Sequence, residues 1–219
     1  MKVSDRMYSF VKDIWDSYNE HPFVKGIAEG SLHIDKFRFY MVQDYLYLMQ
    51  YSKVFGLGVV KAETEEDMRV FAGLVHSTLN CETATHRAYL KRLGITENDM
   101  KIAKPSLITE SYTNYMMAVA FREGIAEVAT TVLACAWSYK MIGDFMETVE
   151  GSKEHEFYGE WVKSYTSKQY RDDNDVIIEL VDRLAENYTE AQIQNLEKII
   201  LDCSRYEYMF WDMAWSKEM

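Results

Sequence analysis

The pattern of apolar and polar positions follows a helical period along nearly the whole chain. Apolar residues recur three or four positions apart, which places them on one side of an α-helix. This pattern predicts helices over about 4–19, 34–61, 64–92, 107–123, 125–149, 154–167, 175–187 and 190–217. An apolar turn precedes Gly30, and a further short helix is expected between Thr96 and Pro105. The chain is therefore predicted to be all-α, a bundle of roughly nine or ten helices.

Several helix ends coincide with recognisable start signals. Thr64 and Thr189 each stand three residues before an acidic or amide side chain, a spacing typical of a capping box. The acidic run 172–175 is expected at the start of the helix over 175–187, because the helix dipole favours negative charge there. The segment 125–142 has almost no polar face, so we expect it to be the central, buried helix.

The composition favours one globular domain over residues 1–219. The chain contains only 10 Gly and 2 Pro, too few for a sandwich or barrel of many short strands joined by Gly/Pro turns. We find no repeat and no linker with a shift in composition. No apolar run reaches the roughly 18–20 residues of a membrane-spanning helix, and the charged first residues do not form a signal peptide. A cytoplasmic, single-domain protein is therefore expected.

The net charge and the aromatic content limit the classes of molecule that the chain is expected to bind. The chain has 24 basic and 35 acidic residues, a net charge of −11. Attraction to phosphate backbones or anionic lipid is disfavoured, so we expect neither nucleic acid nor membrane as a partner. The cysteines at 81, 135 and 203 are odd in number and far apart, which favours reduced thiols. The 16 Tyr, 10 Phe and 5 Trp suffice for a large core and for binding a flat aromatic ligand.

Three helical clusters carry groups suited to chemistry, and they are centred on Asp44, Cys135 and Glu207. Each group shares a helix face with aromatic rings three or four positions away. These and the neighbouring rings are Tyr40, Tyr47, Tyr51, Tyr139, Phe210 and Trp211.

Each central residue also has a purely structural interpretation. A lone helical cysteine is most often a small buried hydrophobe. Asp44 can equally face solvent or cap a neighbouring helix. Glu207 fits a structural role less well, because the surrounding rings indicate burial and a buried carboxylate needs a partner. The spacing alone leaves both interpretations open.

Four stretches of the chain resemble the TenA/thiaminase II family. They are HPFVKGIAEGSL from His21, FRFYMVQDYLYL from Phe37, the helix around Cys135 and YEYMFWDMAW from Tyr206. The stretches lie in the family's order at matching intervals and cover nearly the whole chain; the QDYLYL and YExxFWxMA patterns carry the specificity. The resemblance implies a helical bundle of the haem-oxygenase-like type, typically a homotetramer. It further implies hydrolysis of thiamin or related aminopyrimidines without a cofactor.

The resemblance also implies roles for individual residues. Cys135 corresponds to the nucleophile and Glu207 to the acid/base group. Asp44 holds the aminopyrimidine edge, while Tyr47 and Tyr112 activate the thiol. The other substrate-binding side chains are Tyr139, Tyr165 and Phe210. We expect these side chains to converge on one buried pocket.

The chemistry of this set suits displacement at a pyrimidine methylene. A thiolate that adds to the ring makes the leaving group expellable, and water completes the exchange. Carboxylates stabilise a protonated pyrimidine, and rings hold the flat heterocycle in place. Reactive thiols usually lie near cations, and the set contains no Lys, Arg or His. We therefore infer that proton transfer and the hydroxyls of Tyr47 and Tyr112 activate Cys135 once a cationic substrate is bound.

Two other classes of protein remain alternatives. A helical di-iron oxidase needs Glu and His ligands on several helices, whereas this chain has five His and none after His155. Glu82 and His86 lack the Glu-x-x-His spacing and are assigned to an ordinary surface or interface pair, so no metal site is expected. The second alternative is a non-catalytic regulator that binds a pyrimidine, which the presence of Cys135 and Glu207 disfavours.

Overall fold

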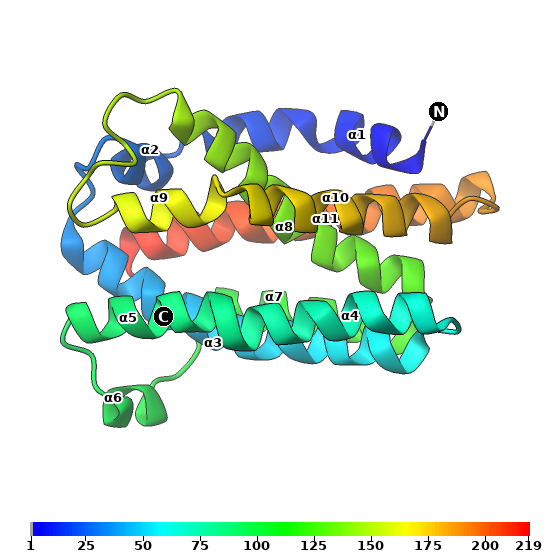
Figure 1. Cartoon of the computed structure of the whole chain (residues 1–219), viewed down its shortest axis with the longest axis horizontal. Coiled ribbons are helices and arrows are strands. Elements are labelled where there is room, and N and C mark those ends of the chain that lie inside the picture. Colours follow the sequence, from blue (N-terminus) through cyan, green and yellow to red (C-terminus); the bar gives the residue numbers. More distant parts are fainter. Residues whose placement is uncertain (1) are drawn as a thin grey trace. The chain divides into compact units, whose positions relative to one another are not determined.

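The computed structural model describes residues 2–219, which form helices and no β-strand (Figure 1). The predicted all-α class is confirmed. Contacts divide these residues into two compact units. Unit 1 comprises the chain up to His33 together with Ala129–Trp211, and unit 2 comprises Ile34–Val128 together with Asp212–Met219. The prediction of one domain over 1–219 stays a prediction. No helix within 2–219 combines the length and apolarity needed to span a membrane.

Unit 1 is built around helices whose apolar stripes face inward. Its helices, two of which also supply residues to unit 2, are α1 (Val3–Tyr18), α2 (Pro22–Ala28), α8 (Ile125–Glu147), α9 (Gly159–Tyr165), α10 (Lys168–Leu184) and α11 (Glu190–Ser216). In α1 the buried side chains recur every three or four residues, from Met7 through Trp15 to Tyr18. Every residue from Ala126 to Ala134 in α8 is buried, which confirms the predicted burial for this part of 125–142, whereas residues 125, 135–137, 140 and 141 are half-buried.

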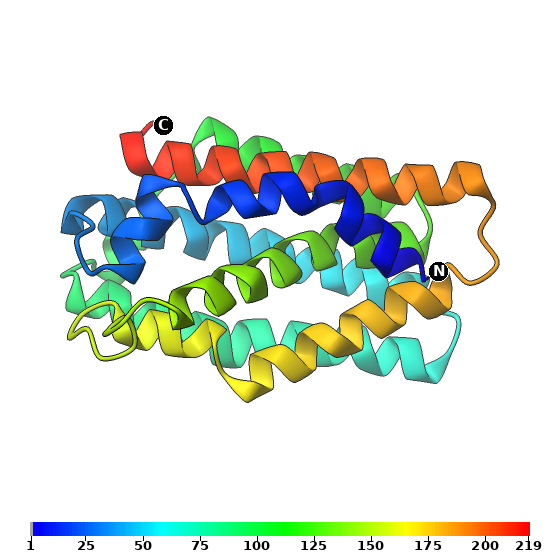
Figure 2. The ribbon, with the colours of Figure 1, turned by 90° about the horizontal axis from the view of Figure 1, so that it is seen from above.

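Polar contacts fasten α1 to its neighbours in unit 1. The Ser4 hydroxyl donates to Asp182 on α10 at 2.8 Å. The Arg6 guanidinium donates to both oxygens of Glu190 on α11, at 2.7 and 2.8 Å. Hydrogen bonds from Arg6 and then from Gln194 lower the pKa of Glu190 to about 2. These contacts hold α1 alongside α11 (Figure 2).

Unit 2 is organised around the long helix α3. Its helices are α3 (Ile34–Lys61), α4 (Glu65–Ser77), the π-helix η1 (Thr78–Glu82), α5 (Thr83–Arg92), α6 (Glu97–Ile102) and α7 (Leu107–Arg122). The helices α4, η1 and α5 follow one another in line along α3 (Figure 1), and α7 packs against α3 as well. The continuous helix predicted over 64–92 is therefore interrupted by a π-helical segment, which the apolar period did not reveal.

The capping residues explain why the predicted starts of some helices agree with the structure and that of α10 does not. Thr64 caps α4 by accepting the Asp67 amide, and Thr189 and Gln192 form the predicted box before α11. The helix predicted over 175–187 begins seven residues earlier. Its cap is Ser167, whose hydroxyl accepts the Tyr170 amide. The acidic run 172–175 therefore lies inside α10, and its predicted place at the helix start is wrong.

The helix predicted over 154–167 is also too long. Residues 148–158 form turns, and α9 begins only at Gly159. A Cβ at Gly159 would lie 2.3 Å from the Lys153 carbonyl oxygen. The chain thus folds back tightly on the start of α9.

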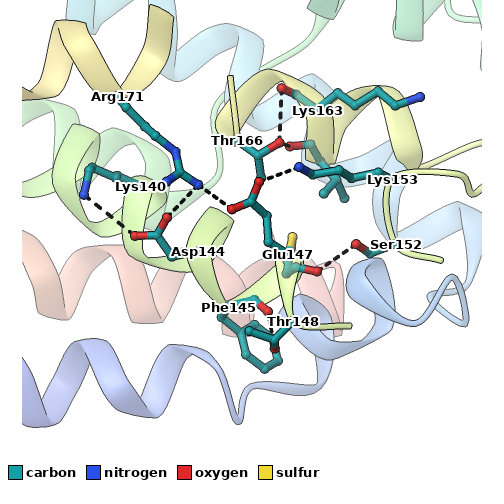
Figure 3. A network of polar contacts seen from close by, with 12 residues as sticks. Lys140, Asp144, Phe145, Glu147, Thr148, Ser152, Lys153, Lys163, Thr166 and Arg171 are labelled. Carbon is teal, nitrogen blue, oxygen red and sulfur yellow. Dashed lines mark hydrogen bonds and ion pairs between the residues drawn. The ribbon is translucent and has the colours of Figure 1, made fainter. Parts of the chain in front are cut away.

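An ion-pair network holds this folded-back segment and α10 against the end of α8 (Figure 3). Arg171 on α10 binds Asp144 at 2.9 Å and Glu147 at 2.5 Å. Lys153 pairs with Glu147 as well. The hydrogen bond from Lys153 is the main reason that the pKa of Glu147 is lowered. The network fixes the approach to α9, which carries Tyr165.

Two glycines in α3 make a matched test of helix packing. A Cβ at Gly58 would lie 2.3 Å from the buried Phe71 ring of α4, whereas a Cβ at Gly56 would meet open space. We expect Gly58→Ala to destabilise the fold by about 1–3 kcal/mol, the usual cost of overpacking. Gly56→Ala should stabilise it by about 0.5–1 kcal/mol through helix propensity. Urea unfolding midpoints at unchanged slope measure both changes. Equal stabilisation by the two variants would contradict the close packing of α3 on α4.

Candidate active site

In unit 2, Asp44 on α3 is buried against His86 on α5. The residue is 5 % exposed, so the alternative that it faces solvent is excluded. Its Oδ2 lies 2.6 Å from Nε2 of His86, whose Nδ1 lies 2.9 Å from the backbone carbonyl oxygen of Glu82. Burial alone lowers the pKa of His86, but the charge of Asp44 and the hydrogen bond to it outweigh burial and raise this pKa above 6.5.

The two predicted thiol-activating tyrosines meet in the same unit. The ring centroids of Tyr47 on α3 and Tyr112 on α7 lie 5.2 Å apart. Both side chains are buried, and the Tyr47 hydroxyl donates to Sδ of Met116 at 3.8 Å. Tyr47 also stacks on Tyr51. Since Asp44 and Tyr47 are one turn apart on α3, the carboxylate and the tyrosine pair share one face of that helix.

In unit 1, Cys135 lies one helical turn before an aromatic cluster. Its thiol is half-buried on α8. One turn further, the Tyr139 ring lies 4.9 Å from Tyr165 on α9 and 5.3 Å from Trp211 on α11. Gly143 permits the close approach of α9, because a Cβ there would lie 2.7 Å from the Tyr165 carbonyl oxygen. The missing side chain at Gly143 therefore lets the end of α9 approach α8, which brings Tyr165 close to Tyr139.

The predicted acid/base residue Glu207 is buried on α11, as its aromatic surroundings led us to expect. It is 3 % exposed, and Phe210 one turn further along is 2 % exposed. Tyr18 on α1 is completely buried near it, and its hydroxyl donates to the Ser204 carbonyl oxygen at 2.5 Å. Burial raises the pKa of Tyr18 and the negative charge of Glu207 raises it further, whereas the hydrogen bond to Ser204 lowers it.

The structure places the eight predicted site residues in two groups. Unit 1 holds the nucleophile, the acid/base group and three substrate-binding side chains: Cys135, Glu207, Tyr139, Tyr165 and Phe210. Unit 2 holds Asp44, Tyr47 and Tyr112. Within each unit, predicted residues lie close together. Their convergence on one common pocket stays a prediction.

Two residues that the sequence reasoning overlooked lie beside these groups. His86 was assigned to a surface or interface pair with Glu82; it is instead 2 % exposed and paired with Asp44. The assignment to a surface or interface pair is therefore wrong, because the imidazole is buried and the Glu82 group that bonds it is the backbone carbonyl. A signal existed, since Thr83, His86 and Leu90 share the inward face of α5. The second residue is Tyr18, the last buried side chain in the apolar stripe of α1.

No three His, Cys, Asp or Glu side chains within residues 2–219 lie together as ligands for an ion. The expectation of a site without metal stays a prediction.

Comparison with known sequences identifies full-length relatives. An aminopyrimidine aminohydrolase of Helicobacter pylori is 44% identical over 215 residues, 98% of this chain and 99% of the relative. An aminopyrimidine aminohydrolase of Halalkalibacterium halodurans is 41% identical over 219 residues, 100% of this chain and 98% of the relative.

Comparison with solved structures confirms the predicted haem-oxygenase-like fold. A TenA homologue from P. horikoshii superposes with a TM-score of 0.90 at 28% identity, covering 99% of each chain. A haem oxygenase from the cyanobacterium Synechocystis superposes with a TM-score of 0.65 at 12% identity, covering 99% of this chain and 94% of the other, which shows the fold alone. The sequence pattern of the TENA/THI-4/PQQC family matches residues 8–217. The chain therefore belongs to the TENA/THI-4/PQQC family.

Proposed function

We propose that this chain is an aminopyrimidine aminohydrolase of thiamin salvage. It hydrolyses 4-amino-5-aminomethyl-2-methylpyrimidine, thiamin or both to 4-amino-5-hydroxymethyl-2-methylpyrimidine. One observation carries the proposal: two relatives bearing that activity in their names match essentially their full lengths at 44% and 41% identity. The buried carboxylates Asp44 and Glu207 and the half-buried thiol of Cys135 supply the chemical groups that such a reaction needs.

The reaction proceeds by covalent catalysis. The thiolate of Cys135 forms a bond to a ring carbon, and the displaced electron pair expels the amine from the methylene, which leaves with a proton from Glu207. Water then adds to the methylene and returns a proton to Glu207. Cleavage of the C–S bond restores the aromatic ring and the thiolate. In sum, one water is consumed and one ammonia is released.

The remaining residues bind and orient the heterocycle. Asp44 accepts hydrogen bonds from the aminopyrimidine edge, because an ionised carboxylate only accepts. Tyr139, Tyr165 and Phe210 hold the flat ring. The hydroxyls of Tyr47 and Tyr112 assist ionisation of the thiol.

We also propose that the chain assembles as a homotetramer and acts in the cytoplasm. The family resemblance is the main support for the tetramer, a common closed arrangement among homo-oligomers. Unit 2 adds a physical argument, because Val60 and Phe121 are 79 % and 67 % exposed at the ends of α3 and α7. These ends are adjacent, since the Lys61 ammonium donates to the Glu123 carbonyl at 2.7 Å. Exposed apolar side chains gathered in this way are typical of interfaces.

Substitution of the nucleophile separates chemistry from binding. We expect Cys135→Ser to nearly abolish ammonia release from aminomethylpyrimidine, because a hydroxyl lacks the nucleophilicity and ionised form of a thiol. Calorimetric binding of the hydroxymethylpyrimidine product should persist. Cys81→Ser, at an exposed cysteine, serves as the matched control and should keep normal turnover. Near-normal turnover by Cys135→Ser would exclude covalent catalysis.

The two carboxylates should differ in what they contribute. Glu207→Gln should lower kcat by roughly 10²–10⁴, the usual range for a positioned acid/base group, with little change in product binding. Asp44→Asn should weaken both binding and rate, because the amide replaces part of the accepting edge with donors. Glu179→Gln, at an exposed position of α10, is the control. Unchanged binding by Asp44→Asn would contradict its role at the substrate edge.

Light scattering measures the assembly. We expect a particle of four times the 25.7 kDa chain mass at micromolar concentration. Replacing the exposed apolar pair by Val60→Lys and Phe121→Lys should reduce the particle mass, because buried charges without partners oppose association. A 25.7 kDa species for the unaltered chain would refute the tetramer.

A further inference from the structure

The imidazole of His86 lies between two groups that only accept hydrogen bonds. Nε2 is 2.6 Å from Oδ2 of Asp44, and Nδ1 is 2.9 Å from the Glu82 carbonyl oxygen. An ionised carboxylate and a carbonyl have no proton to donate. With Asp44 ionised, both ring nitrogens donate, and the ring is an imidazolium. A neutral ring would leave one nitrogen lone pair facing an oxygen lone pair.

The π-helix sets the position of this imidazole. A π-helix is rare, and single π-helical turns inside α-helices are frequently found at functional sites. Here η1 joins α4 to α5 and ends at Glu82, whose carbonyl is one of the two acceptors. Thr78 and Thr83 are buried at the two ends of this joint, and the Thr83 hydroxyl donates to the Leu79 carbonyl at 2.7 Å. The joint thus fixes both the ring and one of its acceptors.

The carboxylate of Asp44 is held by one oxygen and keeps the other available. Oδ2 receives the imidazole, and within the described residues 2–219 Oδ1 accepts no hydrogen bond. An acceptor atom that stays open in a side chain only 5 % exposed is suited to a donor on a ligand. A ligand with an N–H edge supplies that donor.

We infer that His86 is a positioning residue: it holds Asp44 ionised and oriented so that Oδ1 accepts the N–H edge of an aminopyrimidine. This inference rests on the proposed function and deepens it, because it explains how a buried carboxylate stays charged and aimed before the ligand arrives. His86 itself acts through Asp44.

The charges around His86 define the expected pH dependence. α5 packs on α3 and η1, and the ionisable groups that face the ring from them are Asp44 and Glu82, both of which raise the pKa of His86. The charged pair of His86 and Asp44 is therefore fully formed on the His86 side below pH 6.5, the ordinary pKa of histidine. Its stabilising effect is lost as the pH rises through the raised pKa of His86. Above that pH the ring has lost one donated hydrogen bond, so Asp44 loses its fixed orientation and ligand affinity falls.

The free protein gives the first test. ¹⁵N-histidine NMR at neutral pH should show both nitrogens of His86 protonated, and Asp44→Asn should lower the pKa at which His86 titrates. A neutral His86 with an ordinary titration would overturn the inference whether or not the protein is an aminohydrolase.

Steady-state kinetics with aminomethylpyrimidine gives the second test. We expect His86→Gln to raise KM by about 10- to 100-fold, the worth of a hydrogen bond to a charged group, with a much smaller change in kcat. The fall of kcat/KM at alkaline pH should disappear in this variant. His76→Gln, at an exposed histidine of α4, is the matched control and should behave as the unaltered chain.

A third arm asks whether His86 acts through Asp44. In an Asp44→Asn background, His86→Gln should cause little further increase in KM, because the group it positions has changed. Equal increases in both backgrounds would refute positioning through Asp44. An unaltered KM and pH profile in His86→Gln would do the same. If the unaltered chain does not hydrolyse the pyrimidine at all, the proposed function and the assigned ligand both fail, and NMR alone decides whether His86 orients Asp44.

Discussion

Burial of a carboxylate inside a helical protein requires another group to balance its charge, and in this chain the requirement is met by the pair of Asp44 and His86. The 2.6 Å contact joins α3 to α5 and is reinforced by the Glu82 carbonyl on η1. Without the imidazole, an ionised Asp44 would be too costly to bury. The same contact thus stabilises the packing of unit 2 and preserves a charged acceptor for a ligand. The packing of α5 on α3 and the availability of the Asp44 acceptor therefore both depend on the hydrogen bond between Asp44 and His86.

The two units solve the problem of buried polarity differently. Unit 2 pairs the buried Asp44 with an imidazole, whereas in unit 1 the buried Glu207 stands one helical turn from the buried Phe210. Aromatic side chains supply large apolar area, and those of Tyr and Trp also carry a polar tip. Tyr139, Tyr165 and Trp211 bring such rings together from three helices.

Sequence periodicity predicts the helices well because the apolar stripe is repeated many times within each of them. It fails where a single side chain decides the outcome. The cap Ser167 starts α10 earlier than the acidic run predicts. The α9 helix is shorter than predicted, because the preceding chain folds back so that the Lys153 carbonyl lies against Gly159. Similarly, motif resemblance supplies roles for Cys135 and Glu207, but no local pattern reveals that His86 contacts a residue 42 positions away. Such contacts depend on how helices cross, which a one-dimensional pattern does not encode.

The π-helix has a consequence for how this family can vary. A π-helical turn holds one more residue than the α-helical turn it replaces, so η1 acts as a single-residue insertion within the rod formed by α4 and α5. Loss of one residue from Thr78–Glu82 would therefore let the joint close into a regular α-helical turn and remove the wide turn that presents the Glu82 carbonyl to His86, although no contacting side chain had been changed. A length change at this joint is thus a route by which evolution can disconnect the buried acceptor while leaving every motif residue in place.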